Sequence, residues 1–353
     1  MTDRNYYLNI YLKFFRVLFR FLKETQVVWW SILLWALLKL VIAFVFIFIT
    51  ALILIWLLRK IMGHMQYRRG PRHHGPHGIW QTVFDTIKLL GKEDIIPTGV
   101  DRWTFIWAPM IIFVPSLMAF VFLPFAEKIV ATNIEISLFF VLAIMGLSII
   151  ALLMAGWGSN NKYALLGGVR SAAQMMSYEI PMLISAMGVV MMSGSMNLSD
   201  IVRAQQHIWY IVPQLLGFFI FGCASLAEIN STPFDIPEAE SEIVSGFNVE
   251  YSGFRFAAFF LAEFVNLFIV CALAVLLFLG GWLPFTNPVY GTIFFLVKTY
   301  VLIFVVMWIK STFPRFRIDQ FMNFGWKVLL PLSLANLFVT GIVVLIVDKF
   351  RGV

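Results

Sequence analysis

Long apolar runs are the feature that most constrains this chain. The segment from Phe44 to Leu58 contains no charged side chain, and about 20 mostly apolar residues suffice to cross a bilayer as a helix. Lipid offers the backbone no hydrogen bonds, so only helices and closed barrels span it, and these runs lack the alternation of a barrel strand. We therefore predict an all-α polytopic membrane protein with about eight transmembrane helices, near residues 29–58, 104–126, 134–156, 178–195, 210–229, 254–280, 288–309 and 327–347.

The composition agrees with a membrane protein and excludes an iron–sulfur cluster held by this chain alone. Only 13% of the residues are charged and the mean hydropathy is +0.87, whereas a soluble domain has about 25% charged residues. The two cysteines, Cys223 and Cys271, both lie in predicted spans. An iron–sulfur cluster needs about four thiolates, so we expect any such cluster, and any flavin, on a partner protein.

The first 28 residues differ from the rest of the chain. Their polar side chains recur with helical spacing in an otherwise apolar segment, which is typical of a helix lying in the membrane interface. The sequence leaves open whether this segment only anchors the chain or also contacts a neighbouring subunit. We thus divide the chain into an N-terminal interfacial segment, 1–28, and a single transmembrane helical domain, 29–353.

The loop after the first span also predicts a surface helix. Apolar side chains at Ile79, Val83, Ile87 and Leu90 recur on one side, and Gln81, Asp85, Lys88 and Lys92 fall on the other, which is an amphipathic pattern. Glycines and prolines interrupt the histidines of this loop, and no carboxylate stands at ligand spacing. We therefore predict no metal site at His64, His73, His74 and His77.

Basic residues are distributed unequally between the two sides of the predicted bundle. The loops after the odd-numbered spans hold 14 Lys and Arg, whereas the opposite loops and the C-terminus hold four. Cytoplasmic loops are the more basic ones, so we predict that the odd-numbered loops are cytoplasmic. The five further basic residues in the first 28 positions fall on the opposite side and do not fit this rule.

Ionisable residues inside predicted spans are costly and often mark ion or proton pathways. Glu179, Glu228 and Glu263 fall in three consecutive spans, toward the predicted cytoplasmic half or the midplane. They are candidates for a track of carboxyls that bind and release protons. The alternative is that they only hydrogen-bond one helix to another. Three more such residues are Lys39, Glu135 and Lys298.

The loop from Asn230 to Gly253 contains five acidic residues and no Lys or Arg. Asp235 and Glu238 fit the N-terminal capping pattern of a helix that has Pro237 in its first turn. That pattern leaves Glu240 and Glu242 unexplained. We therefore favour a functional acidic loop that binds protons or a cationic partner, in addition to a capping role.

Four segments of this chain resemble the quinone-binding membrane subunit of respiratory complex I, which carries the letter H in bacteria and the number 1 in mitochondria, within the NADH:quinone oxidoreductase family. The longest is Gly156 to Ile180, which reads Gly-Trp-Gly-Ser-Asn-Asn-Lys-Tyr-Ala-Leu-Leu-Gly-Gly-Val-Arg at its start. Motifs of this length are very specific, and the resemblance runs from about residue 50 to the C-terminus. The other three segments are Ala227 to Glu263, Phe313 to Lys327, and the first loop with Gln66 to Pro71 and Asp85 to Glu93.

The resemblance implies a subunit of a quinone-reducing, proton-translocating enzyme that has no complete active site of its own. It implies a quinone chamber shared with a soluble iron–sulfur subunit, a proton path through Glu179, Glu228 and Glu263, and an acidic loop at Glu238, Glu240 and Glu242. Quinone would be the substrate, and the other partners would be membrane subunits, including antiporter-like ones, in a bacterial inner membrane. The implied quinone-binding residues are Arg59, Phe234, Asp235 and Arg255, and the cations expected to dock soluble subunits are Arg68, Arg69, Lys162, Arg315 and Arg317.

Three positions depart from the family pattern, and two other functions compete. Leu58 stands where the family commonly has Glu, Arg72 where it has Asn, and Ser231 where it usually has Arg. One alternative is the matching subunit of an energy-converting hydrogenase or a related complex with another electron donor. The other is a standalone proton-coupled transporter, which the missing internal repeat disfavours.

Overall fold

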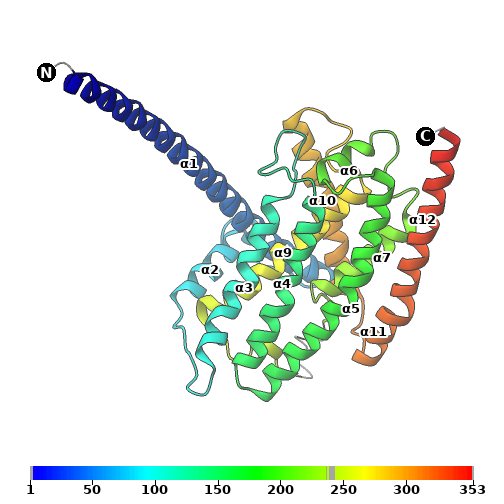
Figure 1. The fold of residues 1–353 in the computed structure, drawn as a ribbon. Coiled ribbons are helices and arrows are strands. Elements are labelled where there is room, and N and C mark those ends of the chain that lie inside the picture. The colour runs from blue at the N-terminus through cyan, green and yellow to red at the C-terminus, as the bar shows by residue number, and fades with distance from the viewer. Residues whose placement is uncertain (1–2, 236, 238–242, 352–353) are drawn as a thin grey trace. The chain divides into compact units, whose positions relative to one another are not determined.

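The computed structural model describes residues 3–235, 237 and 243–351, and these residues form helices and no strand (Figure 1). The chain divides into two compact units, Met1–Phe46 and Ile47–Val353. Apart from three short turns of helix, the elements are α1 (Asp3–Met65), α2 (Trp80–Gly91), α3 (Arg102–Val121), α4 (Ser137–Gly158), α5 (Lys162–Ser193), α6 (Leu198–Ala204), α7 (Leu215–Glu228), α9 (Gly253–Phe278), α10 (Pro288–Thr312), α11 (Ile318–Phe324) and α12 (Leu330–Arg351).

The predicted all-α polytopic class is confirmed. Among the described residues, seven helices are long and apolar enough to cross a membrane. The predicted span 210–229 holds only the shorter apolar helix α7. Pro213 explains the late start of α7, because the residue before a proline is disfavoured in a helical conformation. The predicted helix of the first loop is present as α2, whereas the interfacial position of residues 1–28 stays a prediction.

Helix α5 is longer than the predicted span 178–195. It begins at Lys162, where the side chain of Asn161 accepts a hydrogen bond from the backbone N–H of Tyr163 at 3.0 Å. Such a cap satisfies one of the free donors at a helix start. At the other end, Gly194 adopts a left-handed conformation that suits glycine (φ 70°). The longer helix places Glu179 in its middle, and not at its start.

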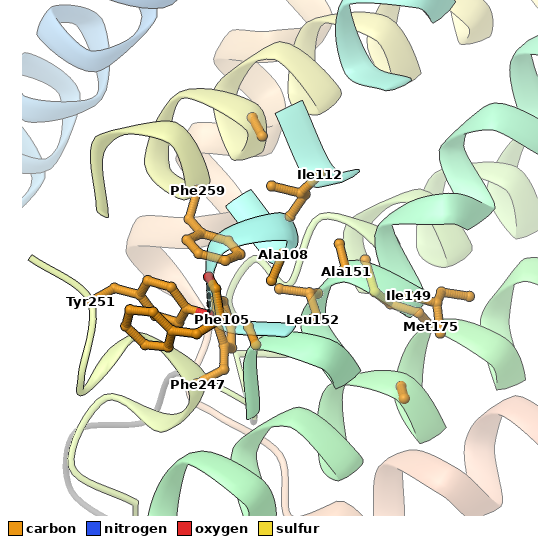
Figure 2. Close-up of a cluster of buried hydrophobic side chains, with 13 residues drawn as sticks. Phe105, Ala108, Ile112, Ile149, Ala151, Leu152, Met175, Phe247, Tyr251 and Phe259 are labelled. Carbon is orange, nitrogen blue, oxygen red and sulfur yellow. Dashed lines mark hydrogen bonds between the residues drawn. The ribbon is translucent and has the colours of Figure 1, made fainter. Parts of the chain in front are cut away.

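Helices α3, α4 and α5 run side by side, and α9 lies inside the second unit (Figure 1). Of the most apolar 18-residue stretch of α9, 78% is buried, compared with 17% of the corresponding stretch in the span formed by α11 and α12. Figure 2 shows the core where α3, α4 and α5 meet the start of α9. The rings of Phe105 and Tyr251 stack there with centroids 4.1 Å apart, which fixes the chain just before α9.

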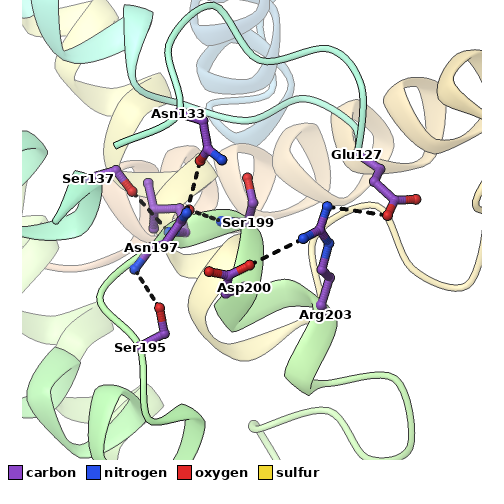
Figure 3. Close-up of polar contacts among 9 residues, drawn as sticks. Glu127, Asn133, Ser137, Ser195, Asn197, Ser199, Asp200 and Arg203 are labelled. Carbon is purple, nitrogen blue, oxygen red and sulfur yellow. Dashed lines mark hydrogen bonds and ion pairs between the residues drawn. The ribbon is translucent and has the colours of Figure 1, made fainter. Parts of the chain in front are cut away.

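Polar contacts join the loop between α3 and α4 to α6 (Figure 3). The amide of Asn197 donates to Asn133 at 2.9 Å, and Arg203 forms ion pairs with Glu127 at 3.4 Å and Asp200 at 3.3 Å. These contacts lie at the end of α3 far from Arg102. These contacts thus hold the connections at this end of the bundle to one another.

Candidate functional site

The structure brings Glu179 of α5 and Glu228 of α7 close together. Glu228 is 4% exposed, and the two carboxyls lie near enough to repel each other. One oxygen of Glu228, Oε2, has no hydrogen-bond partner among the described residues. Glu179 packs against Gly146 of α4, where an added Cβ would come within 2.6 Å of its Oε1. A glycine on α4 therefore makes room for the Glu179 carboxyl.

Glu263 lies on α9, in an ion pair with Lys310 of α10 at 3.3 Å. A cavity of about 10 Å³ adjoins the pair, and Ile229 and Ser231, which follow Glu228, also line it. That volume is about the minimum for one water molecule. The carboxyl of Glu263 is thus next to the segment that follows Glu228. The cavity between them has space for about one water molecule.

The three glutamates of the acidic loop, Glu238, Glu240 and Glu242, lie outside the described residues, as does the capping pattern predicted there. The two residues before them are described. The carboxylate of Asp235 pairs with Arg315 at 3.0 Å. Phe234 is 5% exposed and packs against the rings of Tyr178, Phe316 and Phe321. Phe234, predicted to bind quinone, therefore stands in an aromatic cluster in this structure.

Gln174 of α5 holds this region together, and the sequence reasoning did not single it out. Its Nε2 lies 2.9 Å from the carbonyl oxygen of Ala227, 3.0 Å from Oδ1 of Asn230 and 2.8 Å from the carbonyl oxygen of Phe234. Gln174 is 2% exposed. Gln174 carries no charge, so a criterion based on ionisable residues does not select it. A buried amide in an apolar helix is nevertheless costly unless it is hydrogen-bonded, and this cost is the signal in the sequence.

Arg255 is positioned by the first loop and the core. Its guanidinium lies 3.1 Å from the carboxylate of Asp94 and 5.3 Å from the centroid of the Phe105 ring. The phenol of the neighbouring Tyr251 donates to the carbonyl oxygen of Phe105 at 3.3 Å, and burial raises the pKa of Tyr251 above its ordinary value. Asp94 was not predicted as a site residue, although an Arg in the first turn of a buried helix calls for a counter-charge.

The predicted cations of the basic face are mostly exposed. Arg59 forms an ion pair with Asp85 of α2, and Arg317 is paired with Asp319 at 3.6 Å. Lys162, Arg68 and Arg69 are exposed, and the last two line a pocket of about 510 Å³ together with Arg59 and Arg72. Arg315 has a different position, because its partner Asp235 belongs to the candidate site.

Two other ionisable residues of the predicted spans have separate explanations. Glu135 is exposed and precedes the start of α4, so it is not inside a helix. The ammonium of Lys298 lies 2.7, 3.1 and 2.9 Å from the carbonyl oxygens of Leu279, Gly281 and Leu283. Lys298 therefore binds the chain at the end of α9 and is apart from the three glutamates.

Comparison with known proteins shows the family of this chain. The model of the family described as NADH dehydrogenase matches residues 38–341. The H subunit of the NADH-quinone oxidoreductase of Geobacillus kaustophilus is 54% identical over 288 residues, which cover 81% of this chain and 86% of the relative. Its counterpart in Anoxybacillus flavithermus is 52% identical over the same shares, and that in Brevibacillus brevis is 48% identical over 320 residues, or 89% of this chain and 95% of the relative. The resemblance inferred from the motifs is confirmed, and the chain belongs to the NADH dehydrogenase family.

Proposed function

We propose that this chain is the membrane H subunit of a proton-translocating NADH–quinone oxidoreductase, in which it forms part of the quinone chamber and the start of the proton path. The names of relatives that cover most of the chain support the enzyme. The observation that carries the proton path is the buried Glu228 beside Glu179, with an oxygen that has no hydrogen-bond partner among the described residues. A carboxyl in such a place can exchange a proton with little rearrangement of its neighbours.

The proton path runs from the acidic loop through the three carboxyls of the bundle. Reduction of a quinone to the quinol takes up two electrons and two protons. Negative charge that develops during this step favours proton binding by nearby carboxylates, for which we propose Glu238, Glu240 and Glu242. Glu228 and Glu179 then receive protons, and Glu263 is reached through the cavity lined by Ile229 and Ser231. An amide at these positions would keep the shape but not carry a proton.

The quinone headgroup lies near Arg59, Phe234, Asp235 and Arg255 in this proposal. Arg255 and Asp94 join the start of α9 to the first loop, and Asp235 and Arg315 join the candidate site to the loop after α10. Both pairs lie at the end of the bundle where the basic loops gather. The electrons come from iron–sulfur clusters on a soluble partner, since the two cysteines of this chain are too few to hold one.

The basic odd-numbered loops face the cytoplasm of a bacterium in this proposal, and the soluble subunits dock there. Arg68, Arg69, Lys162, Arg315 and Arg317 supply positive charge to that face, and other membrane subunits cover the sides of the bundle. The N-terminal segment 1–28 lies in the interface. The 14 to four distribution of Lys and Arg supports this orientation.

A deletion strain tests the enzyme assignment. Inverted membrane vesicles from a strain without this chain should lose NADH-dependent quinone reduction and the acidification of their interior, and the wild-type chain supplied from a plasmid should restore both. Vesicles that keep both activities would contradict the assignment. Hydrogen evolution by the purified complex would favour the hydrogenase-type relative, and purification of the tagged chain as a stable particle by itself would favour a transporter.

A further inference from the structure

A basic pocket lies outside the carboxyl path. It has a volume of about 510 Å³ and is lined by Arg59, Arg68, Arg69, Gly70, Pro71, Arg72 and His73. None of these lining residues is acidic, and the acidic partner that the described residues offer to the lining is Asp85, which pairs with Arg59. We call this the arginine pocket. Four arginines line this opening, and such a concentration of positive charge favours an anion.

The wall of the arginine pocket is built by a close reversal of the chain. After the end of α1 the backbone N–H of Arg68 donates to the carbonyl oxygen of Gly63 at 2.8 Å. A Cβ on Gly63 would come within 2.9 Å of the backbone nitrogen of Gly70, so the two segments can approach only because position 63 is a glycine. The arginines therefore project from a packed backbone, and the pocket does not need to form when its ligand arrives.

The position of the pocket along the chain indicates the depth at which it lies. Arg59 directly follows the apolar run that ends at Leu58, so the pocket begins where the chain leaves the hydrocarbon layer. One turn before it, the indole N–H of Trp56 donates to the carbonyl oxygen of His77 at 3.3 Å. Tryptophan is enriched at membrane–water interfaces. The arginine pocket thus lies at the level of lipid headgroups.

Helix α2 supports the same depth independently. The apolar face of α2 is exposed. Between 48% and 59% of each of its large apolar side chains is accessible, namely Ile79, Trp80, Phe84, Ile87 and Leu90. A helix with such a face and a charged opposite face lies in the membrane interface, with its apolar side chains among the acyl chains. The ion pair of Asp85 with Arg59 joins α2 to the wall of the pocket. An acyl-chain surface and an anion site therefore stand side by side.

We propose that the arginine pocket binds the phosphate of an anionic phospholipid, whose acyl chains lie along the apolar face of α2. Guanidinium groups bind phosphate oxygens through paired N–H donors, and basic pockets at the cytoplasmic surface select anionic lipid headgroups. This ligand differs from the soluble partner first expected at Arg68 and Arg69. The depth of the pocket and the adjacent apolar face favour the lipid over an acidic segment of a protein.

The test uses the complete purified complex and two matched double variants. Arg69→Gln with Arg72→Gln removes two charges from the pocket and spares Arg59. Lys92→Gln with Arg102→Gln removes two exposed charges from the same loop region outside the lining. Each complex is placed in nanodiscs of phosphatidylcholine with or without phosphatidylglycerol, and retained lipid is measured by native mass spectrometry.

Wild type and the control variant should each retain one more phosphatidylglycerol per complex than the pocket variant, and phosphatidylcholine should not replace it. Equal retention in all three complexes would overturn the proposal. Displacement of the lipid by inorganic phosphate at equal phosphate concentration would assign the pocket to a free anion. A crosslink from position 69 to an acidic segment of a soluble subunit, in place of lipid, would assign it to docking. None of these results depends on proton pumping, so failure here is distinct from failure of the proposed function.

Discussion

The ammonium of Lys310 lies 3.3 Å from the carboxylate of Glu263, with 23% and 21% of the two side chains exposed. The pair connects α10 to α9 next to a cavity with room for about one water. The ion pair therefore fixes the position of the Glu263 carboxylate and links the two helices beside this cavity.

Replacing Lys310 should impair both stability and coupling. Lys310→Met leaves the Glu263 carboxylate without this cation, and we expect a loss of about 1–3 kcal/mol, between the values for exposed and buried pairs. Lys310→Arg should recover most of the proton yield per electron, since it keeps the charge. The exposed Lys327→Met is the control. A Lys310→Met complex as stable and as well coupled as wild type would show that the pair contributes nothing.

Gln174 should matter for assembly although it carries no charge. Gln174→Leu removes the amide that donates to three buried acceptors near Glu228. The carbonyl oxygen of Ala227 keeps the N–H of Asn230, whereas the carbonyl oxygen of Phe234 and Oδ1 of Asn230 lose this donor, and each unsatisfied buried group costs about 1–3 kcal/mol. We expect a lower thermal midpoint of the purified complex and less assembled enzyme. Met176→Leu, at an exposed position of the same helix, should have little effect. An unchanged midpoint for Gln174→Leu would mean that other donors replace the amide.

Lys298 should be needed for folding and not for proton transfer. Its ammonium is saturated by three carbonyl oxygens at the end of α9, and it lies 4.3 Å from the centroid of the Trp209 ring. Lys298→Met should lower the thermal midpoint of the complex, while the molecules that remain folded keep the wild-type proton yield per electron. The exposed neighbour substitution Val297→Leu is the control. A changed proton yield in folded Lys298→Met enzyme would place this lysine in the path.

The orientation can be measured by cysteine labelling in intact cells. In a background without Cys223 and Cys271, a membrane-impermeant maleimide should leave Lys162→Cys and Arg315→Cys unlabelled until the cells are opened. His207→Cys, which is exposed in the connection between α6 and α7, should label from outside. The reverse result would invert the predicted topology.

Hydropathy predicted the fold class but not every helix boundary. The most apolar 18-residue stretch of α5 has a mean hydropathy of only 1.4, whereas that of the first span, Leu34–Met65, has 3.1. The buried face of its first half carries Gly167, Ser171 and Gln174, which pack against neighbouring elements. Small and polar residues are common where membrane helices touch, so apolarity alone marks the start of such a helix too late.

The candidate site was predictable as a set of residues and not as a set of contacts. Spacing along the chain selected Glu179, Glu228 and Glu263 as acids in successive spans, and the structure buries Glu228 and leaves the other two partly exposed. It did not identify the partners Lys310 and Asp94, because the rotation of one helix against another decides which side chains meet. Gln174 shows that an uncharged polar side chain in an apolar segment can also mark a functional region, because it connects α5 to the segment that follows Glu228.

The proton yield per electron is the most direct test of the account. In sealed inverted vesicles, Glu228→Gln and Glu263→Gln complexes should assemble and reduce quinone with a sharply lower proton yield, because an amide fills the same space but cannot carry a proton. Glu135→Gln, at an exposed position before α4, should pump like wild type. If Glu228→Gln and Glu263→Gln complexes assembled and pumped at the wild-type ratio, the carboxyls would be helix-to-helix hydrogen bonds and the proposed path would be wrong.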